Sequence, residues 1–148
     1  MATSVVPTVR KKLRDQLKAR AALARVQITT GNPQSPDAEY VALLGADEHE
    51  QRQAGMRSAP HPREEDFVLQ VRISVVQAGH ADSESVVDRA FALAAELENE
   101  IRDDMTIGGS LGNGWAEIEG LPFEDLGPNE EGLREARIHA RVHCRARI

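Results

Sequence analysis

Two segments of the chain alternate between apolar and polar residues, the pattern of a β-strand with one buried face. From Phe67 to Val76 every second residue is apolar, and from Ala136 to Ile148 small or apolar residues alternate with arginine and histidine. A period of two places successive side chains on opposite faces of a strand. Both segments are therefore predicted to be strands that present an apolar face to the core.

Apolar residues at spacings of three and four predict two amphipathic helices. The first extends from about Thr3 to Leu23 and carries lysine and arginine on its opposite face. The second begins after Asp82 or Ser83, either of which can act as its N-cap, and ends near Arg102. This second helix directly follows the strand over residues 67–76, so we expect it to cover the apolar face of that strand.

Three shorter strands are predicted, over residues 26–29, 39–44 and 115–119. The glycine-rich residues 107–114 are predicted to form a turn, and residues 45–66, which lack periodicity, a long polar loop or arm. The chain is thus predicted to be a single α+β domain over residues 1–148. We expect a mostly antiparallel mixed sheet of about four to five strands, with two main helices packed on one face.

Composition and charge limit the classes of function. The chain has 148 residues, of which 41% are hydrophobic, and one cysteine, which excludes an intramolecular disulfide. It has neither an apolar run long enough to span a membrane nor a leader, so we expect no membrane partner. A net charge of −6 and 3% aromatic residues oppose tight, sequence-independent binding to DNA.

The charges are unevenly distributed along the chain. Residues 10–25 contain seven basic residues and one acid, whereas residues 96–131 contain eleven acids and one arginine. Like charges repel, so these segments are expected to lie apart or beside opposite charges, within one subunit or between subunits.

Neither a catalytic set nor a metal or cofactor site can be assembled from the sequence. His139 and His143 are four residues apart on a predicted strand, which separates them by about 13 Å, too far to bind one zinc ion. Cys144 lies on the apolar side of the same strand and is expected in the core. The adjacent Asp103 and Asp104 are expected to be a solvated helix end. We therefore expect no enzymatic activity, no cofactor and no metal.

A row of arginines follows one face of the last strand. These residues are Arg137, Arg141, Arg145 and Arg147. They can pair with Glu117 and Glu119 on a neighbouring antiparallel strand, contact an acidic surface of another subunit, or contact DNA in a channel. The negative net charge favours the two protein contacts over DNA.

Two short signatures carry a family resemblance. The end of the second helix, Ile101–Gly109, is similar to an acid–x–x–aliphatic–Gly–Gly helix end, and Arg63–Asp66 leads into the predicted strand over residues 67–76. Together with the order of the predicted elements, both resemble the tail terminator proteins of long-tailed bacteriophages, of the lambda type, and their relatives in gene transfer agents. The similarity covers most of the chain.

This resemblance implies a virion structural protein without a catalytic site. It implies a ring, of six copies, at the head-proximal end of the tail tube, where the ring stops tube polymerisation and provides the surface that joins the head. The expected partners are further copies of the chain, the tail tube protein and a head-closure or connector protein. Genomic DNA would pass through the ring without specific binding, and before assembly the protein would lie in the host cytoplasm.

The loop predicted over residues 45–66 is the candidate contact with the tube or with a neighbouring subunit. Its charged candidates are Glu48, Arg52, Arg57 and Arg63. A head-closure or neck connector protein is the alternative nearest to this interpretation. A small-ligand-binding or nucleic-acid-binding α+β domain is the alternative from another class of function.

Overall fold

The computed structural model describes residues 4–53, 63–78 and 82–148. The helices are α1 (Val6–Lys18), the short 3₁₀ helix η1 (Ala21–Leu23) and α2 (Ser83–Asp103). The strands are β1 (Gln27–Thr30), β2 (Glu39–Gln53), β3 (Arg63–Gln77), β4 (Trp115–Gly120), β5 (Phe123–Leu126) and β6 (Arg134–Arg147).

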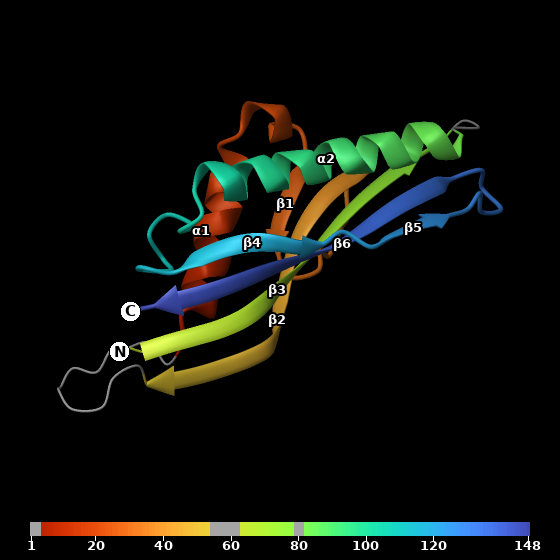
Figure 1. Ribbon diagram of the computed structural model, residues 1–148. Coiled ribbons are helices and arrows are strands. Elements are labelled where there is room, and N and C mark those ends of the chain that lie inside the picture. Colours follow the sequence, from red (N-terminus) through yellow and green to blue (C-terminus); the bar gives the residue numbers. More distant parts are fainter. Residues whose placement is uncertain (1–3, 54–62, 79–81) are drawn as a thin grey trace.

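The six strands of the described residues form one mixed sheet in the order β1-β2-β3-β6-β4, and β5 also pairs with β6. β1 is parallel to β2, and the remaining pairs are antiparallel. α1 packs on β1 and β2, and α2 packs on β3, β6 and β4, so both helices cover the same face (Figure 1). The predicted α+β class is confirmed, and the sheet has one more strand than expected, β5.

The core lies between the helices and the two long central strands. Phe67, Leu69 and Ile73 of β3 are fully buried, as are Ile138 and Val142 of β6, so the alternation predicted for both strands is confirmed. The end of the pattern was predicted wrongly, because Ile148 lies beyond the last strand and is 56% exposed. The first helix also ends earlier than expected, because the chain leaves the helix at residue 19 and turns into η1.

Residues 45–66, expected to be a loop or arm without regular structure, are strand over the residues that the structure describes. Residues 46–53 of β2 pair with residues 63–69 of β3, and residues 64–69 of β3 pair on their other side with residues 142–147 of β6. Residues 46–53 and 63–69, which we call the arm, are therefore the outer part of one end of the sheet. The register shifts twice between residues 43 and 50, and Glu48 takes a φ of 53°. Each such bulge adds an unpaired residue and breaks the two-residue period, so the sequence shows no alternation here. Residues 54–62 of the expected loop lie outside the described residues.

A buried glutamate of the arm ties α1 to the sheet. The side chain of Glu65 accepts hydrogen bonds from the Val5 N–H at 3.0 Å, from the Ser4 hydroxyl and from the Gln51 amide at 3.3 Å. The His49 Nε2 lies 2.6 Å from the same carboxylate. Burial acts to raise the pKa of Glu65, but the hydrogen bonds to its carboxylate outweigh burial and lower this pKa. The negative charge of the Glu65 carboxylate also lies at the positive, N-terminal end of α1, where it stabilises the helix. α1 has no acid in its own first turn.

Aspartates close both ends of α2. Asp82 is the N-cap, and its carboxylate accepts a hydrogen bond from the Ser85 N–H at 2.7 Å. After the helix, Asp104 accepts hydrogen bonds from the Thr106 hydroxyl and the Gly108 N–H, both at 2.7 Å, which lower the pKa of Asp104. The glycine-rich residues 107–114 form turns, as predicted, and lead into β4.

Candidate assembly surfaces

The face of the sheet opposite the helices carries the predicted row of basic side chains on β6. Each of these groups lies within 4.0 Å of an acid of the same chain, so the row is electrostatically compensated within the subunit. The pairs are Arg137–Glu135, His139–Glu124, Arg141–Glu119, His143–Asp66, Arg145–Asp66 and Arg147–Glu64. Three interpretations of the row were open: ion pairing within the chain, contact with another subunit and contact with DNA. The geometry supports ion pairing within the chain.

Asp66 of β3 joins two of these groups. Its carboxylate lies 2.5 Å from the His143 Nε2 and 3.2 Å from the Arg145 guanidinium. Burial acts to raise the pKa of Asp66, but the bonds from His143 and Arg145 outweigh burial and lower it. The Trp115 ring packs edge-on against the His143 ring at 5.4 Å, and the Arg145 guanidinium lies 5.8 Å from the Trp115 centroid. The four side chains form a polar cluster on β3, β6 and β4.

The predicted pairing with β4 is correct for one of its two glutamates. The Arg141 Nε donates a hydrogen bond to the Glu119 carboxylate at 3.3 Å, and its Nη2 reaches the Glu48 carboxylate on β2 at 3.4 Å. Glu117, however, lies opposite His143 in the register, at 4.0 Å from its Nδ1, and not opposite an arginine. A contact of these residues with another subunit or with DNA stays a prediction.

Three of the four candidate contact residues of the expected loop lie on the arm. Glu48 is at the bulge, Arg52 lies 3.5 Å from Glu64, and the Arg63 backbone forms two hydrogen bonds with Ile148. The arm therefore stays paired with β6 up to the C-terminus, and Figure 1 shows its strands extending beyond the helices. Arg57 lies outside the described residues.

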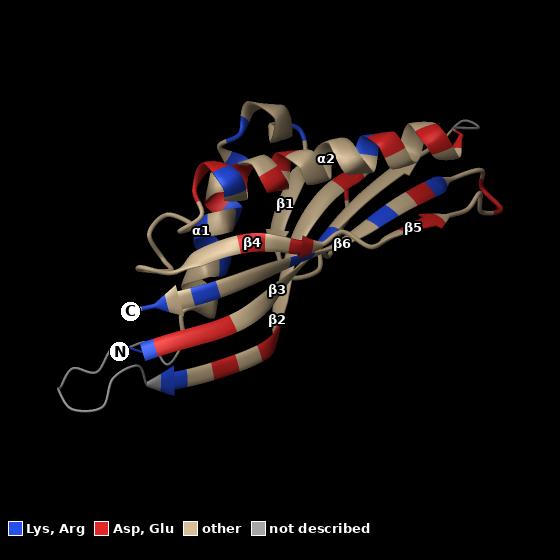
Figure 2. Ribbon diagram, viewed as in Figure 1, with Lys and Arg blue, Asp and Glu red and all other residues tan. Residues whose placement is uncertain are grey.

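Exposed charges without an ion-pair partner gather on two other surfaces. Lys11, Lys12, Lys18 and Arg25 are exposed on and after α1, and among the described residues none of them is in an ion pair. The acidic counterparts are Glu84, Asp88, Glu130 and Glu131, again without an ion pair in the described part of the chain. Figure 2 shows the basic residues on α1, and acidic residues near the start of α2 and at the turn between β5 and β6.

Arg20 connects the basic segment to the acidic α2. Its Nε lies 2.8 Å from the Glu96 carboxylate, and its Nη1 lies 2.6 Å from the Glu100 carboxylate and 3.4 Å from the Asp103 carboxylate. The bonds to Glu100 and Glu96 raise the pKa of Arg20, which is therefore fully charged. The predicted meeting of basic and acidic segments thus occurs within the subunit at this one arginine, which fixes η1 against α2.

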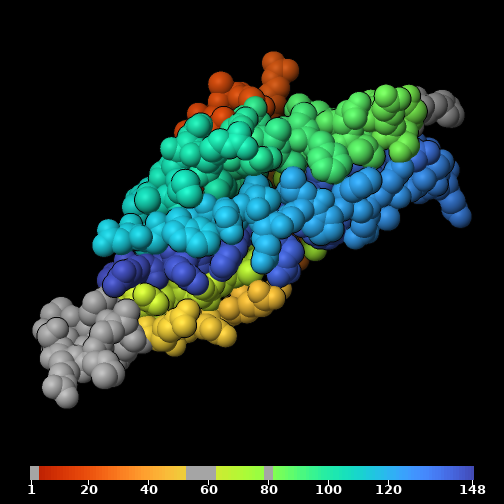
Figure 3. Space-filling model, viewed as in Figure 1, coloured from red at the N-terminus to blue at the C-terminus, as the bar shows by residue number. Residues whose placement is uncertain are grey.

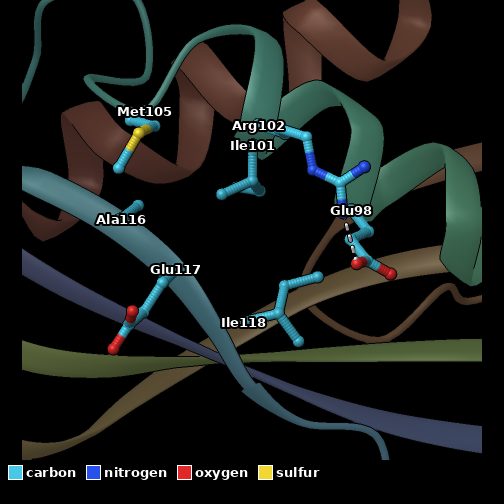
Figure 4. Close-up of a pocket in the computed structure, with 7 residues that line it drawn as sticks. All are labelled: Glu98, Ile101, Arg102, Met105, Ala116, Glu117 and Ile118. Atoms are coloured by element: carbon cyan, nitrogen blue, oxygen red, sulfur yellow. Dashed lines mark hydrogen bonds and ion pairs between the residues drawn. The ribbon is translucent and has the colours of Figure 1, made fainter.

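A cleft of about 210 Å³ opens between the end of α2 and β4 (Figure 4). Its lining is mainly apolar, from Ile101, Met105 and Ile118, and Arg102 at its edge is bonded to Glu98 at 2.8 Å. No nucleophile with an adjacent base lines this cleft. Across the described residues, no three His, Cys, Asp or Glu side chains are placed to hold a metal ion.

Cys144 is fully buried, and burial raises the pKa of its thiol to about 12. It is therefore a core residue, as its position on the apolar side of β6 predicted. Within the described part of the chain, no helix has the length and apolar character to cross a membrane.

Two important features were not predicted from the sequence. Glu65 lies on the core side of β3, where a glutamate breaks the apolar pattern, and that break was its one available signal. β5 has only four residues, all of them exposed, and its Phe123 is 52% exposed. An aromatic residue between a proline and two acids carries no periodic signal for a strand.

Comparisons with known proteins identify no family for this chain. No protein-family model matches it, and no curated protein matches it in sequence. Among solved structures, it is similar to a chain described as "Virion of native gene transfer agent (GTA) particle". The two are 18% identical, the match covers 98% of this chain and 100% of the other, and the TM-score is 0.46.

Proposed function

We propose that this chain is a virion structural protein, a tail terminator that forms a ring at the head-proximal end of a tail tube. The resemblance in sequence suggests this role and a ring of six copies. The observation that carries the proposal is the presence of exposed, unpaired charges of opposite sign on separate surfaces of the described subunit. Such a subunit is suited to contacts with copies of itself.

Head-to-tail contacts explain this arrangement. When one surface of a subunit binds a different surface of the next, the assembly closes into a ring if the rotation between neighbours permits it. Complementary charge on the two surfaces favours the correct partner and opposes contact between two identical surfaces. α1 packs on β1, β2, η1 and α2, far along the sheet order from β5, so the basic and acidic surfaces lie on different parts of the subunit.

The arm is the part of the subunit suited to reach the tube or a neighbour. Its outer strand, residues 46–53 of β2, has no further strand paired beyond it among the described residues, because β1 pairs only with residues 40–43. An edge of this kind can accept a strand from another chain.

The compensated row on β6 fits a surface that DNA passes without binding. Each basic group of the row has an acid beside it, so few positive charges remain to release counterions from DNA. A net charge of −6 adds repulsion of the phosphates.

Electron microscopy of particles assembled without this chain tests the proposal. Overlong tubes are expected if the chain ends tube growth. Tails of normal length that fail to join heads would instead identify a head-closure or connector protein. Complete, normal particles would refute a role in the virion, and a gel-shift titration that shows tight, salt-dependent DNA binding by the purified chain would favour a nucleic-acid-binding domain.

A further inference from the structure

An exposed apolar patch lies where α2 meets β5. Phe123 of β5 is 52% exposed, and its ring packs edge-on against the Phe91 ring of α2 at 5.4 Å. Val87 lies one helical turn before Phe91 on α2, and both side chains are partly buried against the core. We call Val87, Phe91 and Phe123 the aromatic patch. Aromatic side chains are enriched at the centres of protein interfaces.

Two free acids border the aromatic patch. With 100° between successive residues, Glu84, Val87, Asp88 and Phe91 fall within about 100° of one side of α2. Glu84 and Asp88 are exposed, and neither is in an ion pair with another described residue. The patch therefore combines an apolar centre with an acidic border that the subunit itself does not neutralise.

A second surface has the complementary character. Residues 18–25, which we call the elbow, connect α1 to β1 through η1. Ala19, Ala21, Ala22 and Ala24 are exposed there, between the exposed and unpaired charges of Lys18 and Arg25. Small side chains leave room for a large aromatic ring, and the two basic ends match an acidic border.

The elbow is fixed before any partner arrives. Arg20 is bonded to Glu96 and Glu100 of α2 at 2.8 and 2.6 Å, and Leu23 is 2% exposed. A preformed surface loses little conformational entropy when it binds. Figure 3 shows the red-orange chain around residue 20 at the top of the view, beyond the green α2, whereas the blue segment of β5 lies below α2 at the right.

We propose that the aromatic patch of one copy docks on the elbow of the next copy, and that this is the head-to-tail contact of the assembly. The inference rests on the proposed function, because it names the contact that builds the ring. Phe123 enters among the elbow alanines, while Lys18 and Arg25 face Glu84 and Asp88. Because the two surfaces lie on different sides of the subunit, the contact can repeat from copy to copy.

Two charge-reversed proteins test the contact. The first carries Lys18→Glu and Arg25→Glu, so its elbow and its patch are both acidic. The second carries Glu84→Lys and Asp88→Lys, so both of its surfaces are basic. Neither protein can match its own surfaces, but in an alternating mixture every contact again joins opposite charges. All four positions are exposed, and far-UV circular dichroism verifies that both proteins fold.

Association is measured by sedimentation at about 0.05 M salt, where charges interact over more than 10 Å. Samples up to about 1 mM detect even contacts with a dissociation constant near that concentration. We expect the wild type to associate, each reversed protein alone to bind itself at least about tenfold more weakly, and the equimolar mixture to regain the wild-type affinity. The matched control, Lys11→Glu with Lys12→Glu, changes the net charge equally on α1 but outside the elbow and should associate like the wild type.

A mixture that stays as weak as its components, reversed proteins that associate like the wild type, or a wild type that remains monomeric throughout would each refute the contact. These results leave the proposed function to its own test. Overlong tails without the chain, together with no rescue in the mixture, would mean that the ring forms through other surfaces. Normal particles without the chain would refute the function even if the mixture assembles.

Discussion

The bonds of Glu65 predict a large loss of stability when this buried carboxylate is removed. In Glu65→Ala, the Val5 N–H loses its acceptor at 3.0 Å while it stays buried, which costs about 1–3 kcal/mol. Loss of a negative charge at the start of α1 adds about 0.3–1 kcal/mol. His49 is 37% exposed and can turn to water, and removing a buried charge regains part of its desolvation cost. Because the regained desolvation offsets part of this sum, the net expectation is a loss of about 1–3 kcal/mol.

Glu65→Gln separates the charge from the hydrogen bonds. The amide oxygen can still accept from the Val5 N–H, so a smaller loss of about 1–2 kcal/mol is expected. Glu64→Ala is the matched control on the same strand, because the Glu64 side chain is 28% exposed and its ion pairs are long, at 3.5 and 3.9 Å. Pairs of this kind contribute about 0–1 kcal/mol. The assay is urea denaturation followed through the single tryptophan, Trp115.

The same carboxylate predicts a dependence of stability on pH. Because the pKa of Glu65 is lower in the folded protein than in the unfolded chain, its contribution is present above the unfolded pKa and is lost as the pH falls through the folded pKa. The wild type should therefore lose more stability than Glu65→Gln between about pH 6 and pH 3. Equal losses in the two proteins, or a Glu65→Ala protein within about 0.5 kcal/mol of the wild type, would refute this account of α1 anchoring.

Three further predictions concern single residues. A Cβ at Gly114 would lie 1.7 Å from a backbone carbonyl oxygen of β6, so Gly114→Ala should lower the free energy of unfolding by about 3 kcal/mol or more. A Cβ at Gly45 meets open space, so the free energy of unfolding of the control Gly45→Ala should stay within about 0.5 kcal/mol of the wild type. Arg20→Met should lower the free energy of unfolding in urea by about 1–3 kcal/mol, because it breaks two charged hydrogen bonds and leaves Glu96 and Glu100 without a counter-charge. Arg102→Met is the control: it removes only an exposed ion pair within α2 and should cost less than about 0.5 kcal/mol. Burial raises the pKa of Cys144 to about 12, so at pH 8 a thiol reagent should modify the folded protein no faster than it unfolds, and immediate modification without urea would contradict this burial.

The sequence predicts those parts of the fold in which one periodic pattern persists over several residues. β3, β6 and α2 each bury one face against the same core, so their apolar residues recur at the spacing of a strand or a helix. The strands of the arm were not predicted, because two bulges in residues 43–50 interrupt that recurrence. β5 has no buried residue, so no apolar periodicity could mark it.

The candidate surfaces were harder to predict than the elements, because pairing depends on register and not on composition. The sequence shows that acids and arginines are both abundant, but not which of them meet. The bulge between Ile118 and Gly120 brings Glu119, and not Glu117, to Arg141. The position of Phe123 beside Phe91 likewise depends on how β5 adds to the sheet.

Register also decides which charges are available for assembly. The arginines of β6 are the most conspicuous basic residues of the sequence, yet Arg141 and Arg145 already have acids at 3.2–3.4 Å in the same subunit. A partner that bound them would have to replace those bonds, so the net gain would be small. Lys18 and Arg25 have no ion pair to lose among the described residues, and a new pair there adds to the contact without breaking an existing one. The less conspicuous charges are therefore the better candidates for a subunit interface.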